Sequence, residues 1–274
     1  RARFHADRRD PDRQEARARL PFGAIWDNHE FSWQGWQSSQ VLGEGLVPAQ
    51  TLKVAANQVW FEFQPARVSP KGSTLEAFDA PHVMDTPVTD FDDNGLGQEP
   101  NNLVAINSLI GYRTLRWGRH IDLILTDQHS FRGPDPSNRD ELKPLFDGVP
   151  YPFFPEALSM QVDSGRAFAD GHPPEKLVFG GKSIPNYRAG EPAQSMLGAT
   201  QKAWFLERLR SADATWKIWG NSLGTPDWRA DPQNLPDSML PAKWPKWTDG
   251  YAVLGNGDWG GIYHERGEIF DAVR

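Results

Sequence analysis

Two short apolar runs in this chain each lead into a group of polar side chains. Residues 22–25 precede Asp, Asn, His and Glu at 27–30, the first polar cluster, and residues 121–125 precede a second polar cluster at 126–132. Runs of this length are typical of buried strands, and α/β sheets keep their chemistry at strand ends. The pattern therefore predicts an α/β fold with functional side chains where strands end.

The clearest strand signal lies between residues 110 and 125. Two runs, 110–116 and 120–125, flank a Trp-Gly-Arg segment at 117–119. Apolar residues lie two apart in the second run, as a half-buried strand requires. These residues predict a β-hairpin.

Helical patterns occupy three other segments. Residues 11–20 begin with Pro and an early acid, which favours a short surface helix, and residues 51–63 are compatible with a helix. Residues 198–211 have the strongest helical pattern, with an apolar face formed by Ala203, Phe205, Leu206 and Leu209.

Long irregular regions separate these elements. Residues 65–102 and 133–195 are rich in Pro and Gly and are expected to form loops, while residues 216–222 are expected to form a short strand with a polar end. Strand, long excursion, hairpin, helix and strand together predict a layered α/β sandwich with long loop insertions.

Composition limits the classes of function. The 274 residues are 38% hydrophobic, which is enough for one sizeable core, and we expect residues 1–274 to lie within one domain. A net charge of −7 argues against a nucleic-acid surface, and no apolar run approaches the roughly 20 residues of a membrane span. There is no Cys, which excludes disulfides and thiolate ligands. The 12 Trp and 15 Phe fit either core packing or an aromatic-walled pocket.

The first polar cluster has the side chains that phosphoester hydrolysis requires. The amide oxygen of Asn28 is a neutral hard ligand for a divalent ion, and His29 can donate to a phosphoryl oxygen or protonate a leaving group. The carboxylates of Asp27 and Glu30 can bind a second ion or orient the His. From composition alone, a strand end capped by polar side chains explains the cluster equally well.

Other candidates favour structural roles. Residues 90–95 have calcium-loop spacing, but position twelve would be Asn101 and not Glu, so we expect a solvated acidic turn. Residues 255–261 are expected to form a flexible loop at the border of a pocket, with Asp258 and Trp259 at its tip. Five His residues without ligand-spaced partners are interpreted as surface or packing residues: His5, His82, His120, His172 and His264.

Residues 28–30 resemble the Asn-His-Asp/Glu box of the calcineurin-like metallophosphoesterases, and residues 26–31 resemble the Trp-Asp-Asp-His-Glu box of PhoD-like alkaline phosphatases and phosphodiesterases. Further segments resemble that family's elements in the same order along the chain: 125–132, 197–221, 249–251 and 265–266. The resemblance covers nearly the whole chain. It implies a metallophosphoesterase-like fold and a phosphomonoesterase or phosphodiesterase that uses a metal-bound hydroxide.

The resemblance also implies a role for each matching residue. Asn28 and Asp27 would be metal ligands, and His29 would be the catalytic group that contacts the phosphoryl oxygens. Arg132 is a candidate for substrate binding, although a structural ion pair explains it as well. The implied cofactors are Ca and Fe ions, the implied partner is a small-molecule phosphoester, and the implied location is periplasmic or secreted.

Several positions depart from the family pattern. The family's box has Asp where this chain has Asn28, which removes a negative charge, and His129 stands where the family commonly has Arg. The family's outer metal-binding elements would precede residue 1 and follow residue 274, so the chain is expected to be truncated at both ends. Residues 269–274 have the pattern of a helix still running. The remaining ligands would come from other chain segments.

Two further functions stay open. Within enzymes, a phospholipase D-like diesterase shares the family pattern. From another class, a non-catalytic module on a degenerate metallophosphoesterase fold would bind a phosphate or a glycan in an aromatic groove. Loss of hydrolysis after His29→Ala would favour an enzyme, and absence of bound metal would favour the binding module.

Overall fold

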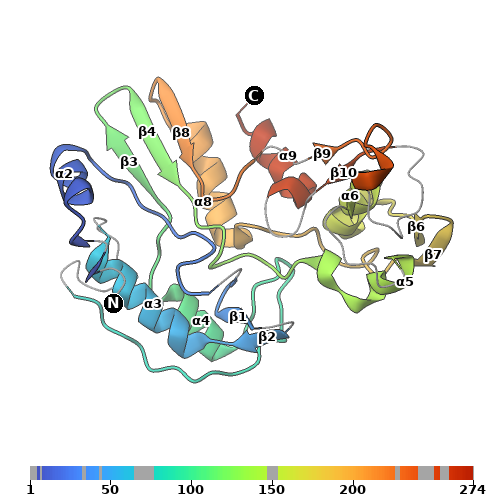
Figure 1. The fold of residues 1–274 in the computed structure, drawn as a ribbon, viewed down its shortest axis with the longest axis horizontal. Coiled ribbons are helices and arrows are strands. Elements are labelled where there is room, and N and C mark those ends of the chain that lie inside the picture. The colour runs from blue at the N-terminus through green and yellow to red at the C-terminus, as the bar shows by residue number, and fades with distance from the viewer. Residues whose placement is uncertain are drawn as a thin grey trace. The chain divides into compact units, whose positions relative to one another are not determined.

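The computed structural model describes residues 5–6, 8–32, 35–42, 45–64, 77–146, 154–225, 229–239, 250–253 and 259–273. The chain divides into two compact units (Figure 1). Unit 1 contains Arg1–Asp90, Gly97–Ser130 and Ala214–Ser222, and unit 2 contains Phe91–Leu96, Phe131–Asp213 and Leu223–Arg274.

Unit 1 is a mixed α/β structure. Its elements in chain order are α2 (Pro11–Arg19), β1 (Ser39–Leu42), β2 (Gly45–Pro48), α3 (Gln50–Phe63), α4 (Pro100–Asn107), β3 (Arg113–Trp117), β4 (Ile121–Leu125) and β8 (Trp216–Gly220). The carboxylate of Asp10 caps α2 by accepting the N–H of Arg13 at 2.9 Å. Helices α2 and α3 confirm those predicted at 11–20 and 51–63.

Strand β4 lies between β3 and β8 in a three-stranded sheet. It pairs antiparallel with β3, where Ile121 lies opposite Trp117, and parallel with β8, where the same residue lies opposite Trp216. A parallel pair needs a long crossover, and the chain between β4 and β8 supplies it. The predicted hairpin and the strand predicted at 216–222 are therefore confirmed.

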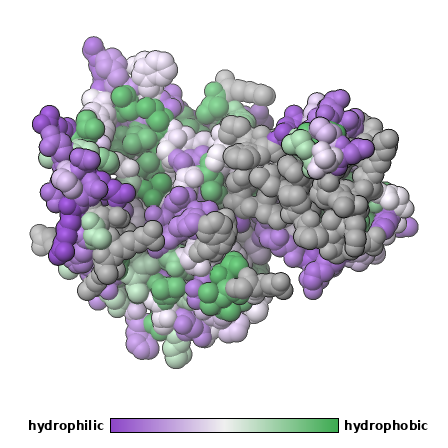
Figure 2. Space-filling model, in the orientation of Figure 1, coloured by the Kyte–Doolittle hydropathy of each residue, from purple (hydrophilic) through white to green (hydrophobic). Residues whose placement is uncertain are grey.

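One face of this sheet is apolar and partly exposed. The register places Trp117, Ile121 and Trp216 in one row, and residues that lie opposite each other share a face. Trp117 is 50% exposed and Trp216 is 66% exposed. Figure 2 shows hydrophobic residues on the surface over this sheet.

The segment before the first polar cluster crosses the same face. Residues 21–27 form neither helix nor strand, so the buried strand predicted at 22–25 is wrong. Gly23 lies against side chains of the sheet, since a Cβ there would be 3.4 Å from Leu123 Cδ2. The carbonyl oxygen of Ala24 accepts from Arg113 Nη2 at 2.7 Å. A side chain satisfies this carbonyl in place of a neighbouring strand.

Helices α3 and α4 pack against each other in unit 1 (Figure 1). The side chains of Trp26, Trp60 and Leu109 form a fully buried cluster beside them. The loop predicted at 65–102 is confirmed where it is described, at 77–99. It ends one turn early because Pro100 opens α4, a position at which Pro is well tolerated.

Unit 2 combines short helices with two small sheets. Its α-helices are α5 (Lys143–Phe146), α6 (Glu156–Ser164), α7 (Phe168–Gly171), α8 (Gly198–Ser211) and α9 (Tyr263–Asp271). Its strands are β5 (Phe154–Pro155), β6 (Lys176–Phe179), β7 (Lys182–Pro185), β9 (Arg229–Ala230) and β10 (Ala252–Val253). Its described residues also form 3-10 turns at Pro136–Asn138, Asp140–Leu142, Gly165–Ala167, Asp237–Met239 and Trp259–Gly261. The order β5-β10-β9 forms one sheet and the β6–β7 hairpin the other.

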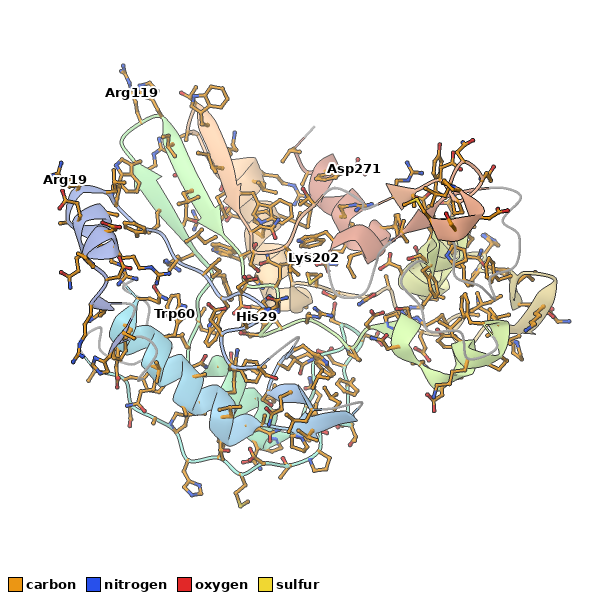
Figure 3. All side chains as sticks on the ribbon, viewed as in Figure 1. Arg19, His29, Trp60, Arg119, Lys202 and Asp271 are labelled. Atoms are coloured by element: carbon orange, nitrogen blue, oxygen red, sulfur yellow. The ribbon has the colours of Figure 1, made fainter. Side chains whose placement is uncertain are left out.

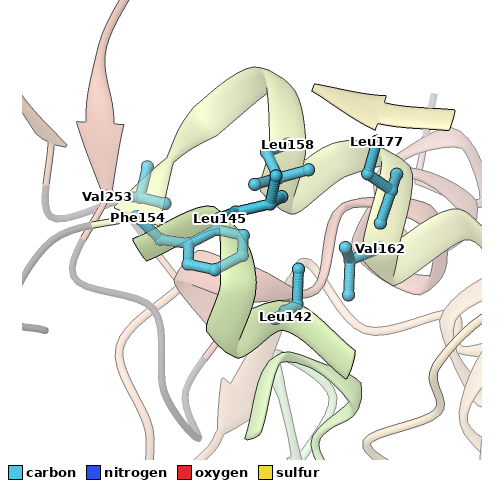
Figure 4. Close-up of a cluster of buried hydrophobic side chains, with 7 residues drawn as sticks. All are labelled: Leu142, Leu145, Phe154, Leu158, Val162, Leu177 and Val253. Atoms are coloured by element: carbon cyan, nitrogen blue, oxygen red, sulfur yellow. The ribbon is translucent and has the colours of Figure 1, made fainter. Parts of the chain in front are cut away.

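A cluster of buried apolar side chains forms the core of unit 2 (Figure 4). Its members are Leu142, Leu145, Phe154, Leu158, Val162, Leu177 and Val253. Burying each of them stabilises the fold by about 1.5–3 kcal/mol relative to exposure.

This core corrects the loop predicted at 133–195. The region contains α5, α6 and α7 together with the β6–β7 hairpin. Leu158 and Val162 lie four residues apart on α6 and are both buried, so a helical period is present but short. Gly180 and Gly181 have positive φ and form the hairpin turn. High Pro and Gly content here marks turns between short elements.

Helix α8 confirms the helix predicted at 198–211, and its start is joined to α9. Gly198 opens it at φ 68°, and a Cβ there would lie 2.9 Å from the carbonyl oxygen of Phe131, so only Gly fits. The buried carboxylate of Glu265 accepts from Ser195 Oγ at 2.6 Å and from the N–H of Leu197 at 3.0 Å. Two segments that the family resemblance singled out, 197–198 and 265–266, therefore meet in one capping contact.

Three other segments with sequence-based expectations are the acidic turn at 90–95, the C-terminal helix α9 and the region from 249 to 261. The Asp92 carboxylate accepts the N–H groups of Asn94 and Leu96, which confirms a turn at 90–95. Helix α9 ends at Asp271. Residues 249 and 254–258, to which two expectations referred, lie outside the described residues. Trp259, expected at the tip of a flexible loop, is instead fully buried in the 3-10 turn Trp259–Gly261, so that part of the expectation is wrong. Within the described ranges, no helix has the length and apolar character needed to cross a bilayer.

Candidate active site

The first polar cluster forms a turn that presents two of its side chains to solvent. Residues 28–29 are the turn, Asp27 and His29 are exposed, and Asn28 and Glu30 are partly buried. Figure 3 labels His29 in unit 1. The cluster is thus accessible to a ligand, as a functional site must be.

Glu30 closes this turn. Its carboxylate accepts the backbone N–H of Asp27 at 2.6 Å. Burial raises the pKa of Glu30, while the bond from the Asp27 backbone and the charge of Lys53 lower it. Glu30 therefore shapes the loop that carries Asn28 and His29, in addition to any role towards a ligand.

Aromatic side chains anchor the turn in the core of unit 1. Trp26 is 1% exposed and stacks on Trp60 of α3, with ring centroids 6.2 Å apart and planes 15° apart. Phe31 meets the Trp26 ring edge-on at 6.5 Å. Such ring pairs contribute about 0.5–1.5 kcal/mol beyond their buried area. The residues immediately before and after the polar cluster are both held by packing.

The part of the second polar cluster in unit 1, residues 126–130, is fully buried. The carboxylate of Asp127 accepts the N–H of His129 at 2.9 Å and the N–H of Ser130 at 2.8 Å. It also accepts from Ser130 Oγ at 2.5 Å. The Thr126 hydroxyl accepts from Trp219 Nε1 at 2.7 Å. The bonds to Asp127 hold the loop together, and the bond from Trp219 joins the end of β4 to β8.

His129 and Arg132 are both buried, with exposures of 2% and 5%. His129 Nε2 lies 3.4 Å from the hydroxyl of Ser222, in unit 1. Arg132 belongs to unit 2. Its predicted contact with substrate therefore stays a prediction.

Lys53 of α3 is a residue that sequence reasoning missed. Its side chain is completely buried, and its Nζ donates to Ser130 Oγ at 3.0 Å. Burial lowers its pKa to about 8, while the charges of Asp127 and Glu30 raise it. The signal was present in the helical period, because the buried positions of α3 include 50, 53, 54, 57 and 60. Lys53 is the cation on that face.

The donor chemistry of the first polar cluster suits a hard divalent ion. Asp27 supplies carboxylate oxygens and Asn28 an amide oxygen, which are ligands for such ions, while the imidazole nitrogen of His29 suits transition metals instead. Across the part of the chain that the structure describes, no three His, Asp or Glu side chains gather as a metal site. Asp27 and Asn28 therefore fit a divalent ion by donor type alone, and the described residues do not assemble a complete site.

Unit 2 contains a pocket of about 440 Å³. Its walls include the arginines Arg139 and Arg188, but both donate to the carboxylate of Glu191, at 2.7 and 2.5 Å. Their charge is therefore matched within the fold. Its walls also include Asp92, Asp93 and Asn94 but no His, so it has carboxylate and amide oxygens without the imidazole of the first polar cluster.

The parallel β4–β8 pair and the polar turns define a mixed α/β protein whose candidate site lies on loops carried by the sheet and helix α3. The sequence model described as PhoD-like phosphatase matches residues 1–274. The chain belongs to the PhoD-like phosphatase family. This confirms the resemblance seen in the sequence.

A solved structure titled "Structure of PhoD" is similar to this chain, with a TM-score of 0.52 and 14% identity. The match covers 97% of this chain and 34% of that chain, so this chain spans about one third of its length. At this identity the likeness establishes the fold, and the predicted α/β class is confirmed. No curated protein matches the chain.

Proposed function

We propose that the protein is a metal-dependent phosphoester hydrolase that acts on small-molecule phosphomonoesters or phosphodiesters. Membership of the PhoD-like phosphatase family supports the class of reaction. The observation that carries the proposal is the exposed turn at 27–30, whose flanking residues Trp26 and Phe31 are fixed in the core. Polar groups on a short turn with anchored ends are already positioned for a ligand.

Each residue of the turn has a chemical task in this proposal. Asn28 and Asp27 would hold a divalent ion, and such an ion supplies charge stabilisation at the phosphoryl oxygens when it is bound. His29 donates an N–H to a phosphoryl oxygen or a proton to the leaving alkoxide. Outside the turn, Arg132 of unit 2 is proposed separately to bind a phosphate through its planar guanidinium.

Three further statements belong to the same proposal. The bound ions are Ca and Fe, residues 1–274 lie within one catalytic domain, and the protein works in the periplasm or outside the cell. Family membership supports the first and third. Metal analysis of the intact protein tests the first, and a single unfolding transition common to probes in both units tests the second.

Hydrolysis of p-nitrophenyl phosphate and of its bis-ester tests the activity. We expect turnover that a chelator abolishes and that His29→Ala lowers about 10²–10⁴-fold, because general acid catalysis contributes that much. His82, an exposed histidine of the same unit, provides the matched control, and His82→Ala should keep full activity. Unchanged turnover in His29→Ala would exclude this mechanism.

A non-catalytic phosphate- or glycan-binding module is the second candidate. It is favoured by the incomplete donor set, since the described residues gather no three His, Asp or Glu at one point. This candidate predicts an intact protein without bound metal or turnover that still binds inorganic phosphate or a glycan. Metal analysis and calorimetric titration with phosphate separate the two functions.

A further inference from the structure

Lys53 is a charged side chain in an unusual position. It is 0% exposed and lies on the buried face of α3. Removing an ammonium group from water costs several kcal/mol even after the protein relaxes. Compensating contacts must therefore surround it, and their identity indicates what this Lys does.

Two aromatic rings face the ammonium. Lys53 Nζ lies 4.3 Å from the ring centroid of Trp26 and 4.9 Å from that of Phe31. Both distances are within the range of cation–π attraction, which is strongest when the partners are desolvated. These two rings also meet edge-on, so the cation and the rings form a single packed group.

The two rings lie on either side of the 27–30 turn in the sequence. Trp26 directly precedes the 27–30 turn and Phe31 directly follows it. One buried cation therefore contacts both ends of the exposed turn. When both ends of a turn contact the same group, the distance between the ends is fixed. The side chains of the turn then vary less in position.

A third contact extends this group to the second polar cluster. Lys53 Nζ donates to Ser130 Oγ at 3.0 Å, and that hydroxyl donates to Asp127 at 2.5 Å. Asp127 in turn fixes the backbone of residues 129 and 130. The chain Asp127–Ser130–Lys53 thus connects a rigid strand end to the turn that carries Asn28 and His29.

We propose that Lys53 is the positioning residue of the candidate active site, holding the 27–30 turn through the Trp26 and Phe31 rings and joining it to Asp127 through Ser130. Its importance for turnover rests on the proposed function. Lys53 acts through other residues, and in this proposal it does not contact substrate.

NMR of the intact protein tests the positioning directly. In Lys53→Met, whose side chain is apolar and of similar length, we expect the amide signals of residues 27–31 to shift and to broaden through exchange on the μs–ms timescale. Signals of the β3–β4 hairpin should remain sharp. Lys217→Met removes an exposed Lys of β8 in the same unit and should leave every signal of 27–31 unchanged.

Kinetics supply the second measurement. A misplaced His29 should lower kcat about 10–100-fold in Lys53→Met, while KM for the bis-ester changes less than about threefold. Ser130→Ala removes the two hydrogen bonds of the hydroxyl, to Lys53 and to Asp127, and keeps both rings, so it should give a smaller effect in the same direction. This milder variant also tests the proposal if Lys53→Met does not fold.

The possible results distinguish a failure of the proposed function from a failure of the positioning role of Lys53. A wild type without phosphoesterase turnover, combined with selective broadening at 27–31 in Lys53→Met, would contradict the proposed function and support the positioning. An active wild type with unchanged 27–31 signals and unchanged kcat in the variant would overturn the positioning. Broadening spread evenly over unit 1 would also overturn it, since that result indicates loss of packing alone.

Discussion

The two polar clusters of unit 1 look alike in the sequence and differ in the structure. Both follow an apolar run and both contain Asp and His. At 27–30 the Asp and the His are exposed. At 126–130 the equivalent pair, Asp127 and His129, is buried, and the carboxylate accepts three hydrogen bonds from the neighbouring residues.

The difference shows what each cluster can do. A carboxylate that already accepts three hydrogen bonds stabilises a loop, and rearranging it for a ligand would leave buried donors without acceptors. Exposed groups on an anchored turn can bind a ligand without that cost. Residues 126–130 therefore form the supporting cluster, which stabilises the fold around the site. Residues 27–30 form the presenting cluster, whose side chains are accessible to a ligand. Lys53 contacts Ser130 of the buried cluster and the two rings that flank the exposed one, so changing it affects both.

The largest expected difference between the two clusters is the loss of stability when the Asp of each one, Asp127 or Asp27, is replaced by Ala. Asp127→Ala leaves the N–H groups of His129 and Ser130 without an acceptor and removes one of the two carboxylates that stabilise the Lys53 ammonium. We expect the free energy of unfolding to fall by about 3–5 kcal/mol, the usual effect of breaking a buried charged network. Urea denaturation measures this loss.

Asp27→Ala is the matched change at the exposed cluster. It should leave the melting temperature within about 1 °C, since most surface substitutions have little effect on stability. Equal destabilisation by the two substitutions would remove the distinction between a supporting and a presenting cluster. Asp127→Asn keeps an acceptor oxygen and should fall between them.

How much of this could be predicted from the sequence depends on the kind of contact. The hairpin at 113–125 and helix α8 were predictable because their apolar periods are regular. The segment 22–25 has the composition of a strand, but the side chain of Arg113 takes a carbonyl that a strand would offer to a neighbour. Sequence patterns report burial well and report hydrogen-bond partners poorly.

The candidate site shows the same limit. Asn28 and His29 could be selected from residue types and from the family resemblance. The different burial of the two clusters could not, because it depends on which rings pack around each. Lys53 is 23 positions beyond Glu30 in the chain. Its helical position predicts burial, but its place between Trp26 and Phe31 follows only from the tertiary structure.

The pH dependence of stability tests the charge that links the clusters. The pKa of Lys53 is about 8 in the folded protein, against 10.5 for the free side chain. Below pH 8 both states hold the proton and this group adds no pH dependence. Between pH 8 and 10.5 the unfolded state binds more protons, so stability rises with pH. We expect a gain on the order of 2 kcal/mol.

The difference in unfolding free energy between wild type and Lys53→Met isolates this gain, because all other groups titrate in both proteins. Measurements at pH 7, 8, 9 and 10 should show the difference growing in favour of wild type. A constant difference would mean that the Lys53 ammonium keeps its ordinary pKa and is solvated, contrary to a buried link between the clusters.

The smallest expected effect concerns the presenting cluster and a metal ion. Asn28→Ala removes a proposed ligand oxygen, and we expect the affinity for divalent ions to fall at least about tenfold, or about 1.4 kcal/mol. Asn28→Asp adds a negative charge at the same place and should raise the affinity instead. Calorimetric titration with Ca²⁺ measures both.

The matched change at the buried cluster is Gln128→Ala, which removes an amide whose oxygen accepts from Ser222 and should leave Ca²⁺ affinity unchanged. If Gln128→Ala weakened Ca²⁺ binding as much as Asn28→Ala, Ca²⁺ affinity would depend on the fold of unit 1 in general. Direct binding of the ion by the exposed turn at 27–30 would then be contradicted.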